Sequence, residues 1–160
     1  MHKLVFSVLM LVLWWMLHAL QIDEEAAMST LHEGKRAVDR AAHAAAQQTD
    51  RDKLEAGILS IDRGKALAAA ETYLQANLRL KSDFTPEERA FLRERVEVKV
   101  FQVINETETF PYVYRNPEYG YEVTLRRPGV VLIVRLVYPR LFGVLDPIEW
   151  NLKGAAELVY

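Results

Sequence analysis

Paired carboxylates are the residues in this chain whose type and spacing come closest to catalytic chemistry. Glu106 and Glu108 flank one threonine, and Glu87 and Glu88 are adjacent. Two carboxyl groups at a suitable separation can serve as acid and nucleophile in glycoside hydrolysis. The first pair falls in a polar turn and the second at a predicted helix start, where acidic side chains are normally solvated or stabilise the helix N-terminus. We therefore expect neither pair to be catalytic.

Metal-ligating and nucleophilic residues are scarce. The chain has four histidines and no cysteine, which excludes a disulfide framework and a cysteine zinc site. Asp50 and Asp52 suggest a calcium loop, but the glutamate expected at its twelfth position is missing. Asp39 and His43 share a helix face at i,i+4 spacing without a further ligand. Since the sequence also lacks a nucleophile elbow, a phosphate loop and a His-Glu-x-x-His motif, we expect no enzyme, no cofactor and no metal site.

A tyrosine-rich stretch is the other group of residues with a potential role in binding. It consists of Tyr112, Tyr114, Tyr119 and Tyr121. Aromatic side chains around a hairpin can form a partner surface, and they can equally pair across two strands inside a sheet. The first alternative would make the chain an extracytoplasmic binding module, so we treat these tyrosines as a candidate partner surface.

Composition limits the other classes of function. The chain has 160 residues, of which 51% are hydrophobic and 26% charged, with a net charge of −2. This length allows one compact domain plus an accessory segment, and the apolar content is too high for a disordered chain. Basic residues are not in excess in either half, so no nucleic-acid partner is expected.

The longest apolar segment of the sequence runs from Leu4 to Ile22 and precedes all the residues named so far. Its 19 residues would span roughly 28 Å as a helix, close to the thickness of a bilayer core. The stretch around Ala19 lacks the pair of small residues that a signal-peptide cleavage site needs. We therefore expect an uncleaved anchor over residues 1–22, with a removed signal as the alternative.

The charges on either side of this run predict an orientation. Lys3 precedes it, whereas Asp23, Glu24 and Glu25 follow it. Because the positive flank of a membrane helix tends to stay in the cytoplasm, we expect a single-pass protein of the cell membrane with a cytoplasmic N-terminus. The rest of the chain would then be extracytoplasmic, with the lipid bilayer as one partner.

Residues 23–48 contain no proline and favour an extension of the same helix. Mostly small residues recur along it at alternating spacings of four and three. This small-residue seam consists of Ala27, Leu31, Gly34, Val38, Ala41 and Ala45. Such a seam allows another backbone to approach closely. The partner of this docking face is either the chain's own sheet or a neighbouring subunit.

The remaining residues, 49–160, predict a small α+β domain. Asp62 is a suitable N-cap for a helix to about Leu78, whose apolar face would hold Leu67, Ala70 and Leu74. Thr85 and Glu88 form a capping-box pattern that predicts another short helix. From Val96 the period changes to two, and five strand segments follow: 96–104, 110–114, 121–126, 130–138 and 148–160. We expect an antiparallel meander of four to five strands covered by the helices.

The order of these parts resembles the TadE/TadG-like pseudopilins of tight-adherence pilus systems. The resemblance rests on the apolar helix continuing into the alanine-rich stretch 38–46, the strand 129–134, the turn from Pro139 to Gly143, and a last strand through Ala155 and Ala156. It implies a structural or assembly role in a type IV-like machine, without catalysis, in contact with other pilin-like subunits or with itself. Pilins of this class carry a glutamate near the start of the mature helix, whereas here none precedes position 24. We expect an unprocessed protein that stays in the membrane, with a place in an extracellular filament as the alternative.

Overall fold

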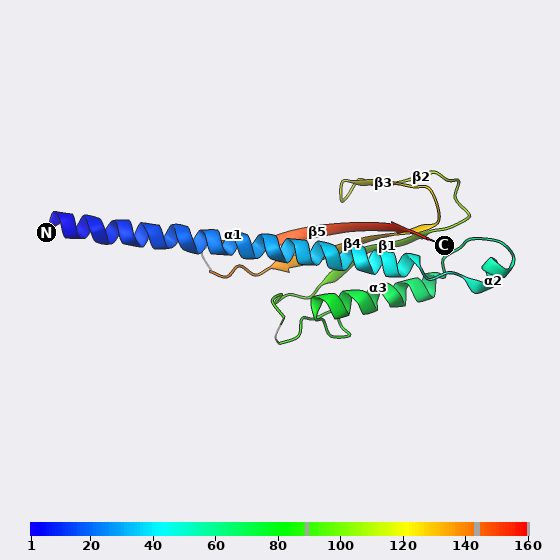
Figure 1. Cartoon of the computed structure of the whole chain (residues 1–160), viewed down its shortest axis with the longest axis horizontal. Coiled ribbons are helices and arrows are strands. Elements are labelled where there is room, and N and C mark those ends of the chain that lie inside the picture. The colour runs from blue at the N-terminus through cyan, green and yellow to red at the C-terminus, as the bar shows by residue number, and fades with distance from the viewer. Residues whose placement is uncertain (89, 143–144, 160) are drawn as a thin grey trace.

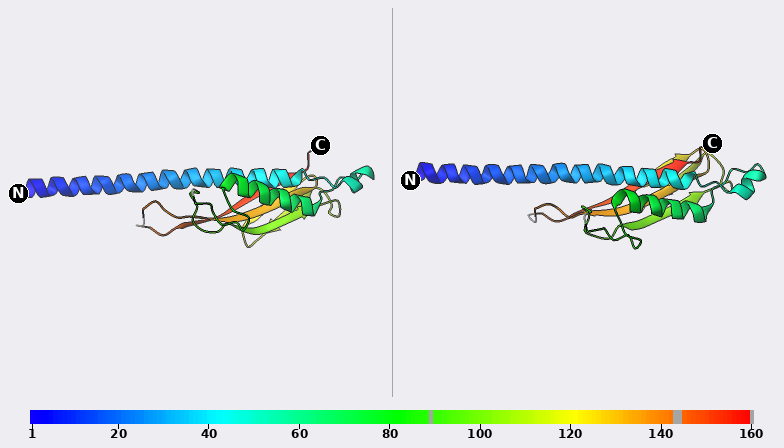
Figure 2. Two further views of the ribbon diagram at one scale, coloured as in Figure 1. Left: turned by 90° about the horizontal axis from the view of Figure 1, so that it is seen from below. Right: turned by 60° about the horizontal axis from the view of Figure 1, so that its bottom comes forward.

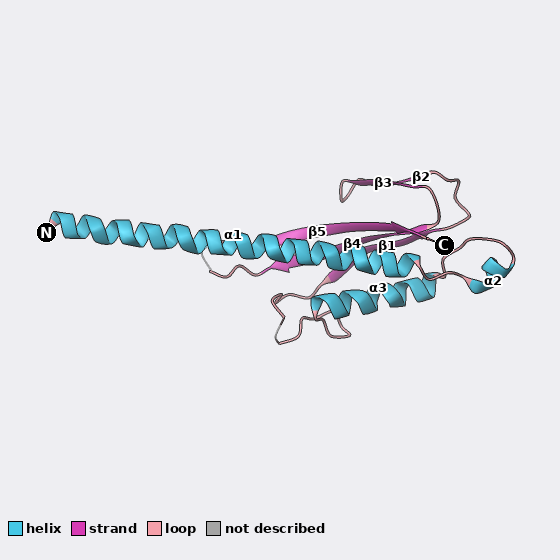
Figure 3. Cartoon of the chain, in the orientation of Figure 1, coloured by secondary structure: helices cyan, strands magenta, loops and turns pink. Residues whose placement is uncertain are grey.

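The computed structural model describes residues 1–88, 90–142 and 145–159. It is an α+β structure in which helices precede strands (Figures 1 and 3). The helices are α1 (His2–Ala46), α2 (Arg51–Glu55) and α3 (Arg63–Leu78), and the strands are β1 (Glu97–Ile104), β2 (Tyr112–Asn116), β3 (Tyr121–Leu125), β4 (Gly129–Tyr138) and β5 (Ile148–Glu157).

Helix α1 is one continuous rod with two different surroundings. At about 1.5 Å per residue, its 45 residues extend roughly 67 Å. The half before Asp23 projects from the rest of the molecule, and nearly every residue in it is exposed (Figure 1). The half from Asp23 onward lies along α3 and the sheet, and most of the residues that it buries there are alanines (Figure 2). The predicted continuation of the apolar helix into the domain is confirmed.

The main sheet has three antiparallel strands in the order β1-β4-β5. Strand β4 lies in the centre, and nine of its ten residues are buried. Val130, Leu132 and Val134 belong to the core shared with α1 and α3, whereas Val131 belongs to a second core under the hairpin β2–β3. Because both of its faces are covered, β4 reads as a continuous apolar run rather than an alternating one.

Strands β2 and β3 form a separate two-stranded sheet, which differs from the simple meander that the sequence suggested. All five strands are antiparallel to their neighbours, but β1 pairs with β4 and the hairpin is inserted between them. The physical reason is the second apolar face of β4. The hairpin packs Tyr114 and Leu125 over this face, so it lies across the sheet and does not extend it.

Helix α3 begins at the predicted cap, because the Asp62 carboxylate accepts hydrogen bonds from the backbone N–H groups of Gly64 and Lys65. Its buried stripe consists of Ala66, Ala70, Leu74 and Leu78. Leu67 is 39% exposed, so its predicted place on the apolar face was wrong. The stripe runs at a constant spacing of four, and this places residue 66, not 67, against α1.

The short helix predicted from Thr85 does not form. A capping box would begin a helix at Thr85, but here the Asp83 carboxylate accepts hydrogen bonds from the backbone N–H of Thr85 at 3.0 Å and from its hydroxyl at 2.6 Å. The backbone of Pro86 instead pairs with Leu80 in an isolated bridge. The backbone N–H of Val96 donates to the Phe84 carbonyl, which ties this connection to the start of β1.

Candidate functional site

A buried carboxylate marks the point where the exposed half of α1 meets the domain. Asp23 is the first buried residue of α1 and is only 2% exposed. It follows directly on the apolar run that ends at Ile22. Acidic side chains are rarely buried unless they are paired, so its surroundings decide what this position does.

Three groups from the end of β4 and the loop after it satisfy the Asp23 carboxylate. The Tyr138 hydroxyl lies 3.0 Å from Oδ1, and the backbone N–H of Leu141 donates to the same oxygen at 2.8 Å. The Arg140 guanidinium donates from Nη1 to Oδ2, also at 2.8 Å. We call Asp23, Tyr138, Arg140 and Leu141 the Asp23 junction.

The electrostatics of the Asp23 junction favour an ionised aspartate. Burial by itself raises the pKa of Asp23, but the hydrogen bonds from Leu141, Arg140 and Tyr138 outweigh it and hold this pKa below its usual value. Burial, together with the hydrogen bond to Asp23, raises the pKa of Tyr138 to about 12. The junction is therefore a carboxylate, a guanidinium and a neutral phenol at neutral pH.

The partners of Asp23 are themselves held in place. The Tyr138 ring stacks on Phe91 at 5.3 Å between centroids and lies 5.9 Å from the ring of Trp150. Arg140 has a φ of 57°, a left-handed backbone conformation that is uncommon for a residue with a side chain. Its Nε donates to the carbonyl of Asp146 at 3.2 Å, which closes the loop between β4 and β5.

This arrangement fits a mechanical role better than a catalytic one. A general base needs a free lone pair aimed at a substrate and a pKa near the working pH. Asp23 instead accepts hydrogen bonds from three partners and has a depressed pKa. The Asp23 junction joins α1 to the β4–β5 loop at the level where α1 leaves the domain.

The small-residue seam predicted on α1 lies against the chain's own sheet. Ala27, Gly34, Val38, Ala41 and Ala45 are buried, and Leu31 is half-buried. A Cβ added at Gly34 would lie 2.5 Å from Leu136 Cδ1 and 2.8 Å from Leu152 Cδ1. A Cβ added at Gly154 would lie 2.9 Å from Val38 Cγ1. Of the two partners that the sequence allowed, the structure places the chain's own sheet on this seam.

The four tyrosines of the candidate partner surface all lie on the β2–β3 hairpin, and three of them pack inside the molecule. Tyr114 is buried, its ring lies 6.4 Å from that of Tyr121, and both belong to the core between hairpin and sheet together with Tyr112. Tyr119 is half-buried and lines a shallow groove beside β5 with Leu31 and Trp150. Tyr119 is the member of the four that faces this groove.

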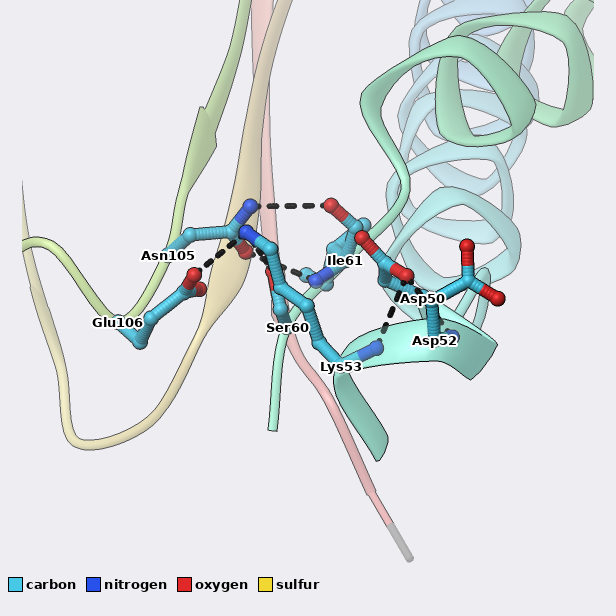
Figure 4. A network of polar contacts seen from close by, with 7 residues as sticks. All are labelled: Asp50, Asp52, Lys53, Ser60, Ile61, Asn105 and Glu106. Carbon is cyan, nitrogen blue, oxygen red and sulfur yellow. Dashed lines mark hydrogen bonds and ion pairs between the residues drawn. The ribbon is translucent and has the colours of Figure 1, made fainter. Parts of the chain in front are cut away.

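A second polar network lies at the opposite end of the domain (Figure 4). Asn105 donates from its amide nitrogen to the carbonyl of Ile61 and accepts from the backbone N–H of Ile61, both at 2.9 Å. Lys53 forms an ion pair with Glu106 at 2.5 Å. These contacts tie the α1–α3 connection to the turn after β1, so the network is structural.

The other acidic residues that the sequence offered as calcium ligands or catalytic pairs cap a helix or lie on the surface. Asp50 caps α2 by accepting hydrogen bonds from the backbone of Asp52 and Lys53. Glu87, Glu88 and Glu108 are exposed at the surface. Within the described ranges, no three His, Cys, Asp or Glu residues are placed to hold a metal ion.

The Asp23 junction is the feature that the sequence did not reveal. Asp23 appeared there only as the first of three acids after an apolar run, while Tyr138 and Arg140 lie 115 and 117 residues further along the chain.

No protein-family model, curated protein or solved structure matches this chain. The functional interpretation therefore rests on its own geometry.

Proposed function

We propose that this chain is a membrane-anchored structural or assembly component of a pilus or type IV-like secretion machine. The observation that carries the proposal is α1: its first half is exposed and apolar, and its second half forms the core of the domain without a break. Among the described residues, α1 is the helix long and apolar enough to cross a membrane. Because α1 is one unbroken helix, the anchor and the domain are joined without a flexible linker.

The layout also supports the pseudopilin-like version of this proposal. The N-terminal helix, the alanine-rich packing face and the terminal antiparallel strands follow the order from which the resemblance to TadE/TadG-like proteins arose. In this proposal the N-terminus is cytoplasmic and the domain extracytoplasmic, as Lys3 and the acidic flank predict. Association with other pilin-like subunits, or with further copies of the chain, occurs through the anchor.

The exposed anchor is the better candidate for association because the small-residue seam already packs on the sheet. Large side chains of the anchor such as Leu9 and Trp14 are half or more exposed. In contrast, Val38 and Ala41 in the seam have no exposed surface. Membrane helices associate by van der Waals packing of their side chains. The exposed side chains of the anchor are free for such packing, whereas those of the seam are not.

Site-specific cross-linking tests this function. The chain has no cysteine, so single cysteines can be introduced without background. We expect Leu9→Cys and Trp14→Cys in native membranes to cross-link to another copy or to another protein with an N-terminal membrane helix. Ala41→Cys is the matched control within α1 and should give no intermolecular product. Cross-links from Ala41 but none from the anchor would contradict the proposal.

The alternative function, an extracytoplasmic binding module, has one observation in its favour. Tyr119 lines the groove beside β5 with Leu31 and Trp150. This alternative places the partner on the domain, so a Tyr119→Cys variant would cross-link while the anchor variants would not. The same experiment therefore separates the two functions.

A further inference from the structure

The loop between β4 and β5 carries a group of exposed apolar side chains at the anchor end of the domain. Leu141, Phe142 and Leu145 are 45%, 41% and 49% exposed. The described residues after β4 and before β5 lie on the side of the domain from which the N-terminal half of α1 projects (Figures 1 and 2). Neighbouring exposed apolar residues in one loop are unusual for a surface in contact with water.

The position of these side chains along α1 is defined by a small apolar cleft. Phe142 and Leu145 line it together with Met16, Ala19 and Leu20 of α1, and Asp23, whose carboxylate is paired with Arg140, lines it as well. Met16 lies six residues before Ile22, which is about 9 Å along a helix. If residues 4–22 span the bilayer, a loop that reaches the level of Met16 and Leu20 lies at membrane depth.

We propose that Phe142 and Leu145 form a second membrane contact by inserting into the leaflet from which α1 emerges. The occupant of the apolar cleft and of the surface around it is lipid, because this surface is continuous with the apolar face of the anchor. The inference rests on the membrane anchoring in the proposed function.

The polar groups of the loop are arranged in a way that suits this environment. Unsatisfied backbone groups are costly in a bilayer, and so are unpaired charges. The Leu141 N–H and the Arg140 guanidinium both donate to Asp23, and Arg140 Nε also donates to the Asp146 carbonyl. The charged side chain of Arg140 is only 11% exposed. The Asp23 junction thus pairs the Arg140 charge and the Leu141 N–H inside the protein, while Leu141, Phe142 and Leu145 remain exposed.

The two contacts together fix how the domain sits on the membrane. A single helix would let the domain rotate about the helix axis and tilt with the helix. A loop inserted beside the helix adds a second point, and the Asp23 junction holds this point at a constant height along α1. The domain would then present one defined side to neighbouring subunits.

Spin-label accessibility in nanodiscs tests this inference on the full chain. Phe142→Cys and Leu145→Cys place a nitroxide at exposed positions, so folding is preserved. Leu54→Cys, which is 47% exposed on α2 at the far end of the domain, is the aqueous control. Leu9→Cys is the control within the anchor. We expect the ratio of oxygen to nickel-chelate collision rates at 142 and 145 to be several-fold higher than at 54 and to approach that at 9.

Each other result overturns the inference in a recognisable way. A ratio at 142 and 145 equal to that at 54, with a lipid-like ratio at 9, would place the loop in water and leave the anchor intact. Low collision rates with both reagents at 142 and 145 would show a protein partner on the loop. A water-like ratio at 9 would remove both the inference and the anchoring in the proposed function.

Discussion

The Arg140 guanidinium lies 2.8 Å from the Asp23 carboxylate, although 117 residues separate the two in sequence. Their side chains are 11% and 3% exposed, so this is a buried ion pair rather than a surface one. It lies at the one level of α1 where exposed apolar helix gives way to packed helix. This contact fixes α1, at the point where its exposed half begins, to the residues that follow β4.

Breaking this pair should destabilise the domain strongly. Asp23→Ala removes the carboxylate that pairs with the Arg140 charge and accepts the Leu141 N–H, whereas the Tyr138 hydroxyl keeps the Asp23 backbone carbonyl as an acceptor at 3.1 Å. Removing one partner of a buried pair costs about 3–5 kcal/mol. Glu24→Ala is the matched control, because Glu24 lies 3.7 Å from Arg140 but its side chain is 69% exposed. Its loss should cost under about 1 kcal/mol. Chemical unfolding in detergent micelles measures both, and equal effects would contradict a specific role for Asp23.

Tyr138 predicts an alkaline limit to stability. Its pKa is raised to about 12 in the folded state, from an ordinary value of 10. The unfolded chain therefore loses this proton first as the pH rises above 10, and the stabilisation is lost as the pH approaches 12. Difference absorbance of the phenolate should show a late-titrating tyrosine whose signal is lost in Tyr138→Phe, beside Tyr119 and Tyr121, whose pKa values are also raised. In Asp23→Asn the Tyr138 phenol should titrate earlier, since the hydrogen bond and the negative charge both contribute to its shift. An unchanged titration would contradict the contact.

Gly34 should be needed for folding of the domain rather than for assembly alone. A Cβ there would lie 2.5 Å and 2.8 Å from the Cδ1 atoms of Leu136 and Leu152, so these packed side chains would have to shift. Overpacking of this kind typically costs about 1–3 kcal/mol. Gly34→Leu should therefore lower the melting temperature. His32→Leu, on the exposed side of the same helical turn, should leave it nearly unchanged. A Gly34→Leu protein that melts normally but fails to associate would mean that the small-residue seam packs against a neighbouring subunit and not against the chain's own sheet.

Two leucines of α3 should respond very differently to the same substitution. Leu74 has no exposed surface, whereas Leu67 is 39% exposed. Leu74→Asp would bury an unpaired carboxylate at a cost of several kcal/mol, against a total stability of about 5–15 kcal/mol. We expect Leu74→Asp to unfold the domain and Leu67→Asp to leave it folded, as followed by circular dichroism. A folded Leu74→Asp protein would mean that α3 is not part of the core.

Sequence patterns predicted the elements well where the pattern itself reports burial. The period-two stretches became strands, and Asp62 capped α3 as expected. The Thr85 pattern failed where Asp83, two residues earlier, accepts hydrogen bonds from both the backbone N–H and the hydroxyl of Thr85 and so holds a turn. A local motif predicts structure only if no neighbouring group offers its atoms a better partner.

The pairing of elements was less accessible, for a physical reason. The sequence predicted one antiparallel meander covered by the helices, whereas β2 and β3 form a separate sheet, because the apolar run of β4 does not say which segments cover its two faces. The Asp23 junction depends on contacts across more than a hundred residues, and no local spacing encodes these. The position of an acid immediately after an apolar run is the one signal that pointed toward it.

Topology mapping in intact cells tests the central claim most directly, namely that α1 anchors an extracytoplasmic domain in the membrane. A single cysteine at Leu54, on the exposed surface of α2, reports the side on which the domain lies. We predict that the full-length Leu54→Cys protein stays in the membrane fraction after carbonate extraction and reacts with an impermeant maleimide before lysis. A soluble species that begins after Ala19 or Ala27, or a cysteine that reacts only after lysis, would contradict the claim.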